Sequence, residues 1–311
     1  MPTSRRLRLA LLTVAVAAGC GSGCGGKGPA APAAERTATR AASPLTRSPA
    51  LCRALRASVT GRVRIPGVDE LSGLVASRRR AGIWWSHEDS GAGPVLWALR
   101  GDGSPAGRWD VAGAGAVDWE DIAAGPGPDG QPVLYVADIG DNAGSRASID
   151  VYRVPEPGPG SGTTAPAARL ALRYPDGAHD AEALLVDPRR GTLVVVTKGL
   201  TGGRAYTLPA PLPFGGSATL RRGPRIGLGL VTAGDVSRDG AVVALRGYGQ
   251  LAVWTRRGRE PLTTTLRRPP CTSPTTLADG QGESLALDST GTSFRTVPEG
   301  PNAPMRRYTP R

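Results

Sequence analysis

The sequence predicts an all-β fold, and three observations lead to that prediction. The chain of 311 residues contains 44 Gly and 29 Pro, a content that requires frequent turns and disfavours long helices. Its apolar residues occur in many short runs bounded by glycine, as strands do. An acid at the start of such a run recurs along the chain; the five acids are Glu70, Glu120, Glu182, Asp235 and Glu283.

The spacing of these acids predicts a β-propeller. Consecutive acids are 50, 62, 53 and 48 residues apart, and a period near 50 residues with several strands per repeat is typical of propeller blades. Each acidic strand is followed by a glycine-containing turn and a second apolar run, because glycine supplies the positive φ of tight hairpin turns. A third run with one Trp or Tyr follows in each repeat; these runs are VLWAL, DVYRV, RAYTL, LAVWT and MRRYT.

The fourth strand of each repeat decides how the ring closes. We expect it in four repeats, as GRWDV, ARLALRY, TLRRGPRI and LTTTLRR. The fifth repeat ends at Arg311 without one, whereas residues 59–65 (VTGRVRI) have the same polar character. We therefore expect five four-stranded blades over residues 58–311, closed by this N-terminal strand. A ring of six blades, with one degenerate blade in a loop, is the alternative.

The first residues have the features of an export signal. Within residues 1–19 a basic segment precedes ten apolar residues (9–18), a run too short to span a bilayer. The sequence AAGC ending at Cys20 resembles a lipobox and predicts lipidation of that cysteine. Residues 20–57 are rich in Gly, Ala and Pro, as expected of a tether. We expect an exported protein on the outer face of the cell membrane, or a secreted one if the lipobox is not used.

Two of the other three cysteines, and the net charge, restrict the expected partners. Cys52 and Cys271 are expected to form a disulfide, since ordered cysteines of exported proteins most often pair; two free thiols are the alternative. The formal charge is +12, from 38 Lys and Arg of which only Lys27 and Lys198 are lysines. The arginines are scattered rather than clustered with aromatic residues, which argues against nucleic acid. We expect a monomer whose membrane contact is the lipid anchor.

The hairpins predict one polar rim on the central channel. In a hairpin, the start of the first strand lies beside the end of the second, so the five acids are expected on this rim together with Asp138, Asp141 and Asn142. Reflection about the turns places Lys198 opposite Glu182 and Arg246 opposite Asp235. The acids either accept hydrogen bonds from backbone N–H groups of neighbouring blades or hold a hard cation such as Ca²⁺.

The rim supplies the candidate site residues. The candidate metal ligands are Glu70, Glu120, Asp138, Asp141, Glu182, Asp235 and Glu283. Lys198, Arg246 and His87 are the candidate catalytic residues, although no nucleophile-elbow, P-loop or dinucleotide-binding motif is present. His87 and His179 lack the spacing of a zinc site and are expected to be hydrogen-bonding rim residues.

The motifs ELSGL, DWEDIA, LYVADIGDN, DAEALLVDPRRGTLVVVTK and GESLAL resemble those of phytase-like β-propeller proteins, over about residues 60–300. The resemblance implies that the acids line the channel and that calcium and phosphate bind there. It implies calcium-side roles for Glu120, Asp138, Glu182 and Glu283. Lys198 and Arg246 would be the phosphate-side cations.

Three functions remain open on the sequence alone. The first is a membrane-anchored lipoprotein that binds a cation or a small polar or anionic ligand at the channel rim. The second is a calcium-dependent phosphoesterase, in which metal ions gather the phosphate and a metal-bound water attacks. The third is a non-catalytic scaffold for an envelope protein or polymer.

Overall fold

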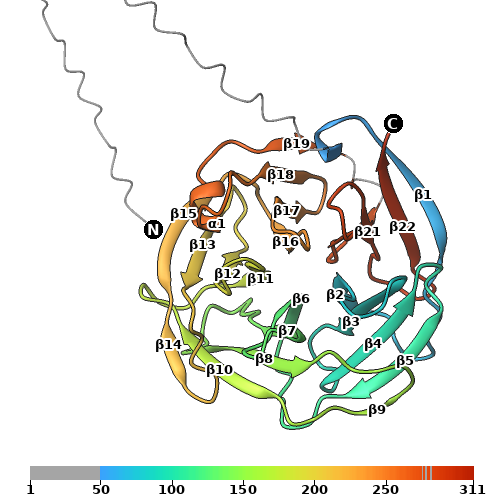
Figure 1. Ribbon diagram of the computed structural model, residues 1–311, viewed down its shortest axis with the longest axis horizontal. Helices are drawn as coiled ribbons and strands as arrows, with labels where there is room; N and C mark the ends of the chain where they lie inside the picture. The colour runs from blue at the N-terminus through green and yellow to red at the C-terminus, as the bar shows by residue number, and fades with distance from the viewer. Residues whose placement is uncertain (1–49, 275, 277–278, 281) are drawn as a thin grey trace, which may run out of the picture. The chain divides into compact units, whose positions relative to one another are not determined.

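The computed structural model describes residues 50–274, 276, 279–280 and 282–311. Five β-sheets radiate from a common axis, and in each the strand that opens the blade's first hairpin lies nearest the axis (Figure 1). Neighbouring strands in the blades are mainly antiparallel and consecutive in sequence. The predicted five-bladed propeller is confirmed. Among the described residues, no helix has the length and apolar character needed to cross a membrane.

The first two blades each contain five strands. Blade 1 consists, from the axis outward, of β2 (Leu71–Ala76), β3 (Ile83–Glu88), β4 (Val95–Arg100), β5 (Pro105–Asp110) and β9 (Gly162–Thr163). Blade 2 consists of β6 (Trp119–Pro126), β7 (Pro132–Asp138), β8 (Ile149–Pro155), β10 (Ala168–Arg173) and β14 (Ser217–Thr219). The outermost strand of each is a short parallel addition from a later loop, so four strands form the repeating unit.

The other three blades contain four strands each. Blade 3 consists of β11 (Ala181–Val186), β12 (Leu193–Thr197), β13 (Gly203–Leu208) and β15 (Arg221–Ile226). Blade 4 consists of β16 (Val231–Val236), β17 (Val242–Gly247), β18 (Leu251–Thr255) and β19 (Cys271–Ser273). Blade 5 consists of β20 (Ala286–Leu287), β21 (Phe294–Thr296), β22 (Pro304–Pro310) and β1 (Leu55–Arg62).

The N-terminal strand closes the ring as predicted. β1 pairs antiparallel with β22, from Leu55 opposite Pro310 to Arg62 opposite Pro304. The strand begins four residues earlier than the expected Val59, and a short 3₁₀ turn, η1 (Ala50–Cys52), precedes it. The expected disulfide between Cys52 and Cys271 is present and links η1 to β19 of blade 4 across 219 residues of sequence. Strand pairing and disulfide therefore close the ring at two adjacent places.

The prediction that LTTTLRR forms the fourth strand of blade 4 is wrong. Residues Leu262–Thr265 form a helical turn, α1, after Pro261, and the strand that completes the blade is β19. Leu262 and Leu266, four residues apart, are both buried in the core between blades 3 and 4. An i, i+4 apolar pair lies on one helical face. The strand prediction rested on the threonines, whereas burial of the two leucines favours a helical turn.

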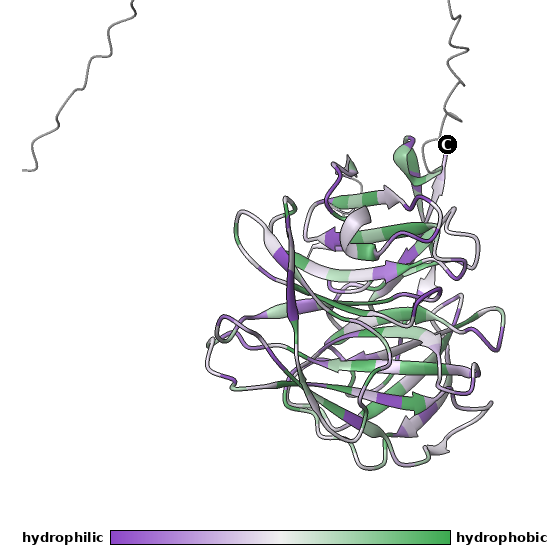
Figure 2. Cartoon of the chain, turned by 60° about the vertical axis from the view of Figure 1, so that its left-hand side comes forward, coloured by the Kyte–Doolittle hydropathy of each residue, from purple (hydrophilic) through white to green (hydrophobic). Residues whose placement is uncertain are grey.

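Apolar layers between blades form the core. Hydrophobic residues recur along the strands of all the blades (Figure 2). One buried cluster joins blades 2 and 3 and contains Tyr135 and Val151 of blade 2 together with Leu184 and Val195 of blade 3. Equivalent clusters join the other blades. Each blade therefore buries both faces, as propeller blades do.

In four blades the innermost strand contains a β-bulge, at which one residue has no pairing partner in the neighbouring strand. The pairing register shifts between Ser72 and Leu74, Trp119 and Asp121, Ala181 and Ala183, and Val231 and Ala233. The residues passed over are Gly73, Glu120, Glu182 and Thr232. A bulge commonly redirects a side chain beside a functional site. Glu120 and Glu182 are therefore structurally equivalent, whereas Glu70 lies three residues before the bulge position and Asp235 three residues after it.

Asp121 ties three blades together at the axis. Its side chain is fully buried, and its carboxylate oxygens accept backbone N–H bonds from Ile122 (2.9 Å), Leu184 (2.9 Å) and Gly234 (3.3 Å). Asp235 accepts similar bonds from Val236 (2.7 Å) and Leu287 (2.8 Å) in blade 5. The expectation that acids accept hydrogen bonds from backbone N–H groups of neighbouring blades is confirmed for Asp235, and Asp121, which was not among the five predicted acids, does the same.

We predict that Asp121→Ala lowers the free energy of unfolding by at least about 2 kcal/mol, because it leaves buried N–H donors of three blades without an acceptor. Urea unfolding followed by tryptophan fluorescence measures this loss. Asp110→Ala is the matched control, since it removes an exposed ion pair with Arg108 (2.9 Å) worth less than about 1 kcal/mol. Equal effects of the two substitutions would contradict the role assigned to Asp121.

Candidate functional site

Seven carboxylates gather at one mouth of the channel, where the innermost strands begin. They form three overlapping groups whose oxygens lie within 4.8 Å of one another: Asp89, Glu283 and Glu299; Asp89, Asp118 and Glu120; and Glu120, Asp180 and Glu182. Because Asp89 and Glu120 each belong to two groups, the seven form one continuous row, which we call the acidic arc. Two oxygens bound to one Ca²⁺ at 2.3–2.6 Å are separated by at most about 5 Å, so each group matches the span of one ion.

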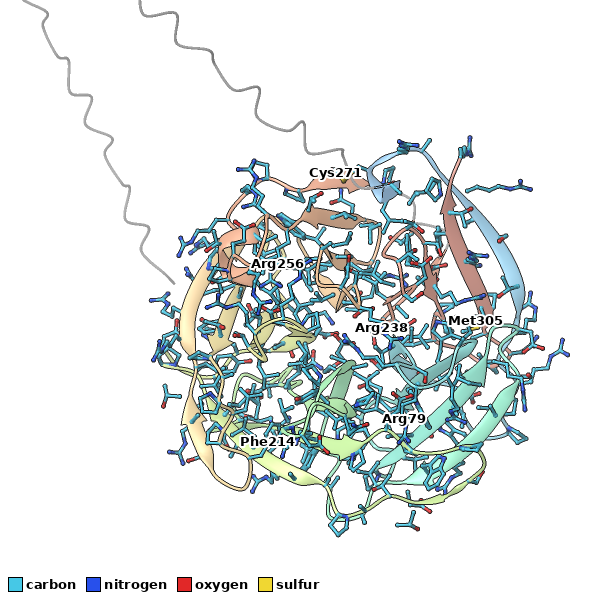
Figure 3. All side chains as sticks on the ribbon, viewed as in Figure 1. Arg79, Phe214, Arg238, Arg256, Cys271 and Met305 are labelled. Atoms are coloured by element: carbon cyan, nitrogen blue, oxygen red, sulfur yellow. A yellow bond between two sulfur atoms is a disulfide. The ribbon has the colours of Figure 1, made fainter. Side chains whose placement is uncertain are left out.

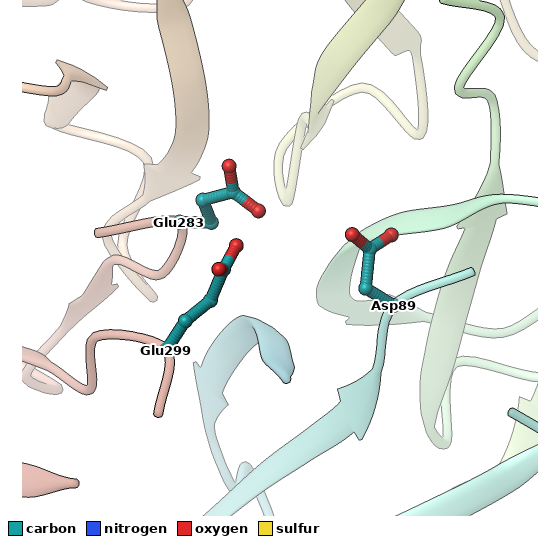
Figure 4. A group of neighbouring side chains, drawn as sticks. All are labelled: Asp89, Glu283 and Glu299. Carbon is teal, nitrogen blue, oxygen red and sulfur yellow. The ribbon is translucent and has the colours of Figure 1, made fainter. Parts of the chain in front are cut away.

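The blade 5 end of the arc consists of Glu283, Glu299 and Asp89. Glu283 and Glu299 extend side by side towards Asp89, which faces them from the end of blade 1 (Figure 4). Burial and a hydrogen bond with Glu283 raise the pKa of Glu299 to about 8. Burial, with the nearby charges of Glu283 and Asp118, raises the pKa of Asp89 to about 6. This end of the arc therefore retains protons at neutral pH when no cation compensates its charge.

Glu120 and Glu182 occupy the centre of the arc. Their bulge positions leave the side chains 3% and 2% exposed. Burial, followed by the charge of Glu182, raises the pKa of Glu120 far above its usual range. Burial also raises the pKa of Glu182 to about 8, although Lys198 opposes the shift. Among the described residues, Oε2 of Glu182 has no hydrogen-bond partner, so a buried acceptor faces the arc unsatisfied.

Lys198 and Tyr248 close the blade 3 and 4 side of the mouth. The ammonium of Lys198 pairs with Oε1 of Glu182, which confirms the cross-strand position expected from the hairpin. Burial disfavours the charge of Lys198, but Glu182 outweighs this and raises the pKa of Lys198. The ammonium also lies 5.5 Å from the ring centre of Tyr248, whose hydroxyl donates to Oε1 of Glu283 (3.1 Å). One cation and one phenol therefore border seven acids.

Asp138 and Asp141 belong to the supporting structure beneath the arc. Asp138 is fully buried, accepts the backbone N–H groups of Val117 and Asp118 (3.1 Å each) and pairs with Arg146 (2.8 Å). Asp141 accepts the N–H groups of Ser145 and Arg146 (2.9 Å each). Its own N–H donates to Oδ1 of Asp180 (2.9 Å), which orients an arc member. Asn142 is exposed beside them.

Glu70 and Asp235 lie outside the arc. Glu70 is exposed in the loop before β2 and lines a hollow with Asp69, Glu88 and Asp89 at the edge of the mouth. Asp235 lies at the opposite end of the channel, in a small cavity with Arg78 and Arg238. The expectation that all five acids share one rim is therefore wrong for Asp235. Asp235 lies towards the far end because it follows the bulge position of its strand by three residues instead of occupying it.

The side chains of Arg246 and His87 are fully buried. Arg246 pairs with Ala233 in the ladder and not with Asp235. Its guanidinium is fully buried, lies 2.9 Å from Oδ2 of Asp279 and donates to the carbonyl of Ser284 (2.9 Å). His87 is also fully buried, with Nδ1 2.8 Å from the carbonyl of Glu88, and burial lowers its pKa to about 4. Both side chains hold blade ends together.

His179 is the other histidine and belongs to a separate polar cluster. Its Nε2 lies 3.1 Å from Asp176 and 2.8 Å from the hydroxyl of Tyr206. Arg222 pairs with the same Asp176 (2.9 Å), and Tyr174 packs edge-on against the imidazole. His179 is thus a hydrogen-bonding residue, as expected, and it precedes Asp180 of the arc directly.

The candidate site residues proposed from the sequence did not include Asp89, Asp118, Asp180, Glu299 or Tyr248. Two of them had a local signal, because Asp118 and Asp180 each precede a bulge glutamate by two residues in the pattern Asp-x-Glu. Alternate residues of a strand share a face, so the pattern places two carboxylates together in blades 2 and 3. Glu299 and Tyr248 come from loops with no such periodicity.

Comparisons with known proteins add no assignment. No protein-family model matches the chain. No curated protein matches it either. Its function must be argued from the propeller and the acidic arc themselves.

We predict that the cation-free protein becomes less stable as pH rises from about 6.5 to 8.5. Glu182 and Glu299 have pKa values raised to about 8, so the folded state binds more protons than the unfolded state in this window and loses stability as they ionise. The lowered pKa of His87, about 4, makes the protein more stable as pH rises, but only below pH 6.5. Thermal melts in chelator across this range test the prediction, and Glu299→Gln should flatten the slope. Constant stability between pH 6.5 and 8.5 would contradict it.

Proposed function

We propose that the protein is an exported β-propeller lipoprotein whose acidic arc binds a hard divalent cation, with Ca²⁺ the best-matched ion, and through it a small polar or anionic ligand. The observation that carries the proposal is the buried Oε2 of Glu182, which has no hydrogen-bond partner among the described residues and lies in a row of carboxylates where burial raises the pKa values of Glu120, Glu182 and Glu299. Like charges brought so close are costly without a counter-ion. A cation bound by oxygen ligands would replace the retained protons and satisfy the free acceptor.

The charge balance favours binding over phosphoester hydrolysis. Of the two cations implied for a phosphate site, Lys198 is beside the arc but Arg246 is fully buried against Asp279. Lys198 is itself paired with Glu182, so little positive charge faces an incoming phosphate other than that of the bound cation. We therefore propose a ligand-binding role and assign no catalytic residue.

Millimolar Ca²⁺ should raise the melting temperature of the wild-type chain, since a ligand that binds the folded state stabilises it by about 2.7 kcal/mol at 100 times Kd. Glu120→Gln should remove this shift, because it removes a carboxylate ligand from the centre of the arc, and should change the calcium-free melt little, because Glu120 already retains its proton there. Isothermal titration calorimetry gives the affinity.

Asp110→Asn, at an exposed acid distant from the arc in sequence and paired with Arg108, is the matched control and should keep the full calcium shift. The proposal fails if calcium leaves the wild-type melt unchanged, or if Glu120→Gln retains the full shift.

The anchor is tested separately in cells. We expect Cys20→Ala to abolish lipid labelling and to leave the precursor unprocessed, as globomycin should do in the wild type, because the modified cysteine is the residue on which lipoprotein processing depends. Radiolabelled fatty acid incorporation and the size of the chain measure this. A Cys24→Ala control should be processed normally. Processing of Cys20→Ala at the wild-type rate would contradict the anchor.

A further inference from the structure

The channel end opposite the acidic arc carries exposed arginines on rigid turns. The turns that join the first and second strands lie there in blades 1, 3 and 4, and the segment after β18 lies beside them. The exposed arginines of these segments are Arg79, Arg190, Arg238, Arg257 and Arg259. We call this surface the basic face; Figure 3 shows Arg238 near the ring axis and Arg79 farther out, in blade 1.

Hydrogen bonds join the separate turns into one surface. Arg190 of blade 3 donates to the carbonyl of Arg259 in blade 4 (3.2 Å), and Arg259 donates to the carbonyl of Arg189 (2.8 Å). Arg189 also bonds the carbonyls of Asp239 and Gly258. Arg79 donates to the carbonyl of Glu156 (3.0 Å). Backbone carbonyl acceptors thus hold Arg79, Arg190 and Arg259 in place without neutralising their charge.

The positive charge of the basic face is not neutralised locally. Within the described part of the chain, none of its five arginines forms an ion pair. The exposed acids on the same inner turns are Asp129 and Asp239, and Oδ1 of Asp239 is already bonded by Ser237 and the N–H of Ala241. Burial lowers the pKa of half-buried Arg78; the charges of Asp235 and Glu156 oppose this shift, and that of Arg238 adds to it.

A hollow of about 530 Å³ opens beside these arginines between blades 1 and 2. Arg79 and Arg153 supply guanidinium groups to its wall, and Pro132, Val133 and Pro155 supply an apolar floor. Guanidinium groups suit phosphate oxygens, whereas the apolar floor suits carbon. A phospholipid headgroup with its glycerol has this combination of chemistry.

We propose that the basic face docks on an anionic phospholipid surface, with the acidic arc directed away from it. The inference rests on the proposed lipid anchor. The expected tether of residues 20–49 would reach roughly 30 Å as a flexible chain, enough for a ring anchored at its edge to lie flat. A negative surface attracts the basic face and repels the arc, and each arginine near it strengthens binding about fivefold. The lipid anchor and the basic face together provide the two signals that stable attachment needs.

The test is co-sedimentation of the expected mature chain, residues 20–311, with phosphatidylcholine vesicles that contain or lack phosphatidylglycerol. All variants carry Cys20→Ala and lack residues 1–19, so neither an acyl chain nor the basic, apolar signal segment contributes. Chelator is present, so the acidic arc holds no cation. We expect salt-sensitive binding to the anionic vesicles alone. Neutralising three charges in R79Q/R238Q/R257Q should weaken it roughly 100-fold.

The matched control R173Q/R221Q/R225Q removes three exposed arginines from the outer strands β10 and β15 and should bind like the parent; thermal melts verify that both variants fold. Equal binding by R79Q/R238Q/R257Q and its parent, or an equal loss in the control, would overturn the proposal. So would retention on an anionic polysaccharide without vesicle binding, which would assign the face to a polymer. None of these outcomes depends on calcium binding or on processing at Cys20.

Discussion

Closure of the ring is the constraint on which the rest of the structure depends. β1 and β22 are at opposite ends of the domain's sequence, and the hydroxyl of Ser58 donates to the backbone carbonyl of Arg307. Blade 5 is therefore incomplete until the whole chain is folded. The Cys52–Cys271 disulfide fastens the neighbouring seam, and it removes entropy from the unfolded chain by closing a long loop. Closure also brings the innermost strands of blades 1 and 5 together, since the N–H of Gly73 bonds the carbonyl of Glu283 (3.2 Å).

The same closure concentrates charge at the axis. Inner strands converge there, so each blade's first side chains face those of the others, and the bulges turn Glu120 and Glu182 into this space. Two kinds of acid result. Asp121 and Asp235 are satisfied by backbone N–H groups and hold blades together. In the arc, burial raises the pKa values of Glu120, Glu182 and Glu299, and Oε2 of Glu182 has no hydrogen-bond partner among the described residues, which is the basis for proposing a cation there.

The two ends of the channel carry charges of opposite sign, because the open end and the turn of each inner hairpin contain different residues. The strand starts carry carboxylates, whereas the turns of blades 1, 3 and 4 carry arginine. A ligand site on one side and a charged docking surface on the other are compatible, because about the length of an inner strand separates them and six residues of strand span roughly 20 Å. The proposed anchor, basic face and arc would thus set the orientation in which the protein meets its ligand.

The sequence by itself determined the propeller, the closing strand, the disulfide and the pairing of Lys198 with Glu182, because these follow from strand period, turn residues and hairpin reflection. It did not determine the helical turn α1, because this turn forms where its leucines pack between blades 3 and 4. Nor did it place Asp235 or Arg246, because one bulge residue shifts the register of all that follows in a strand. The arc itself was decided by the tertiary structure: Glu299 joins Glu283 and Asp89 only because a closed ring brings the last blade against the first.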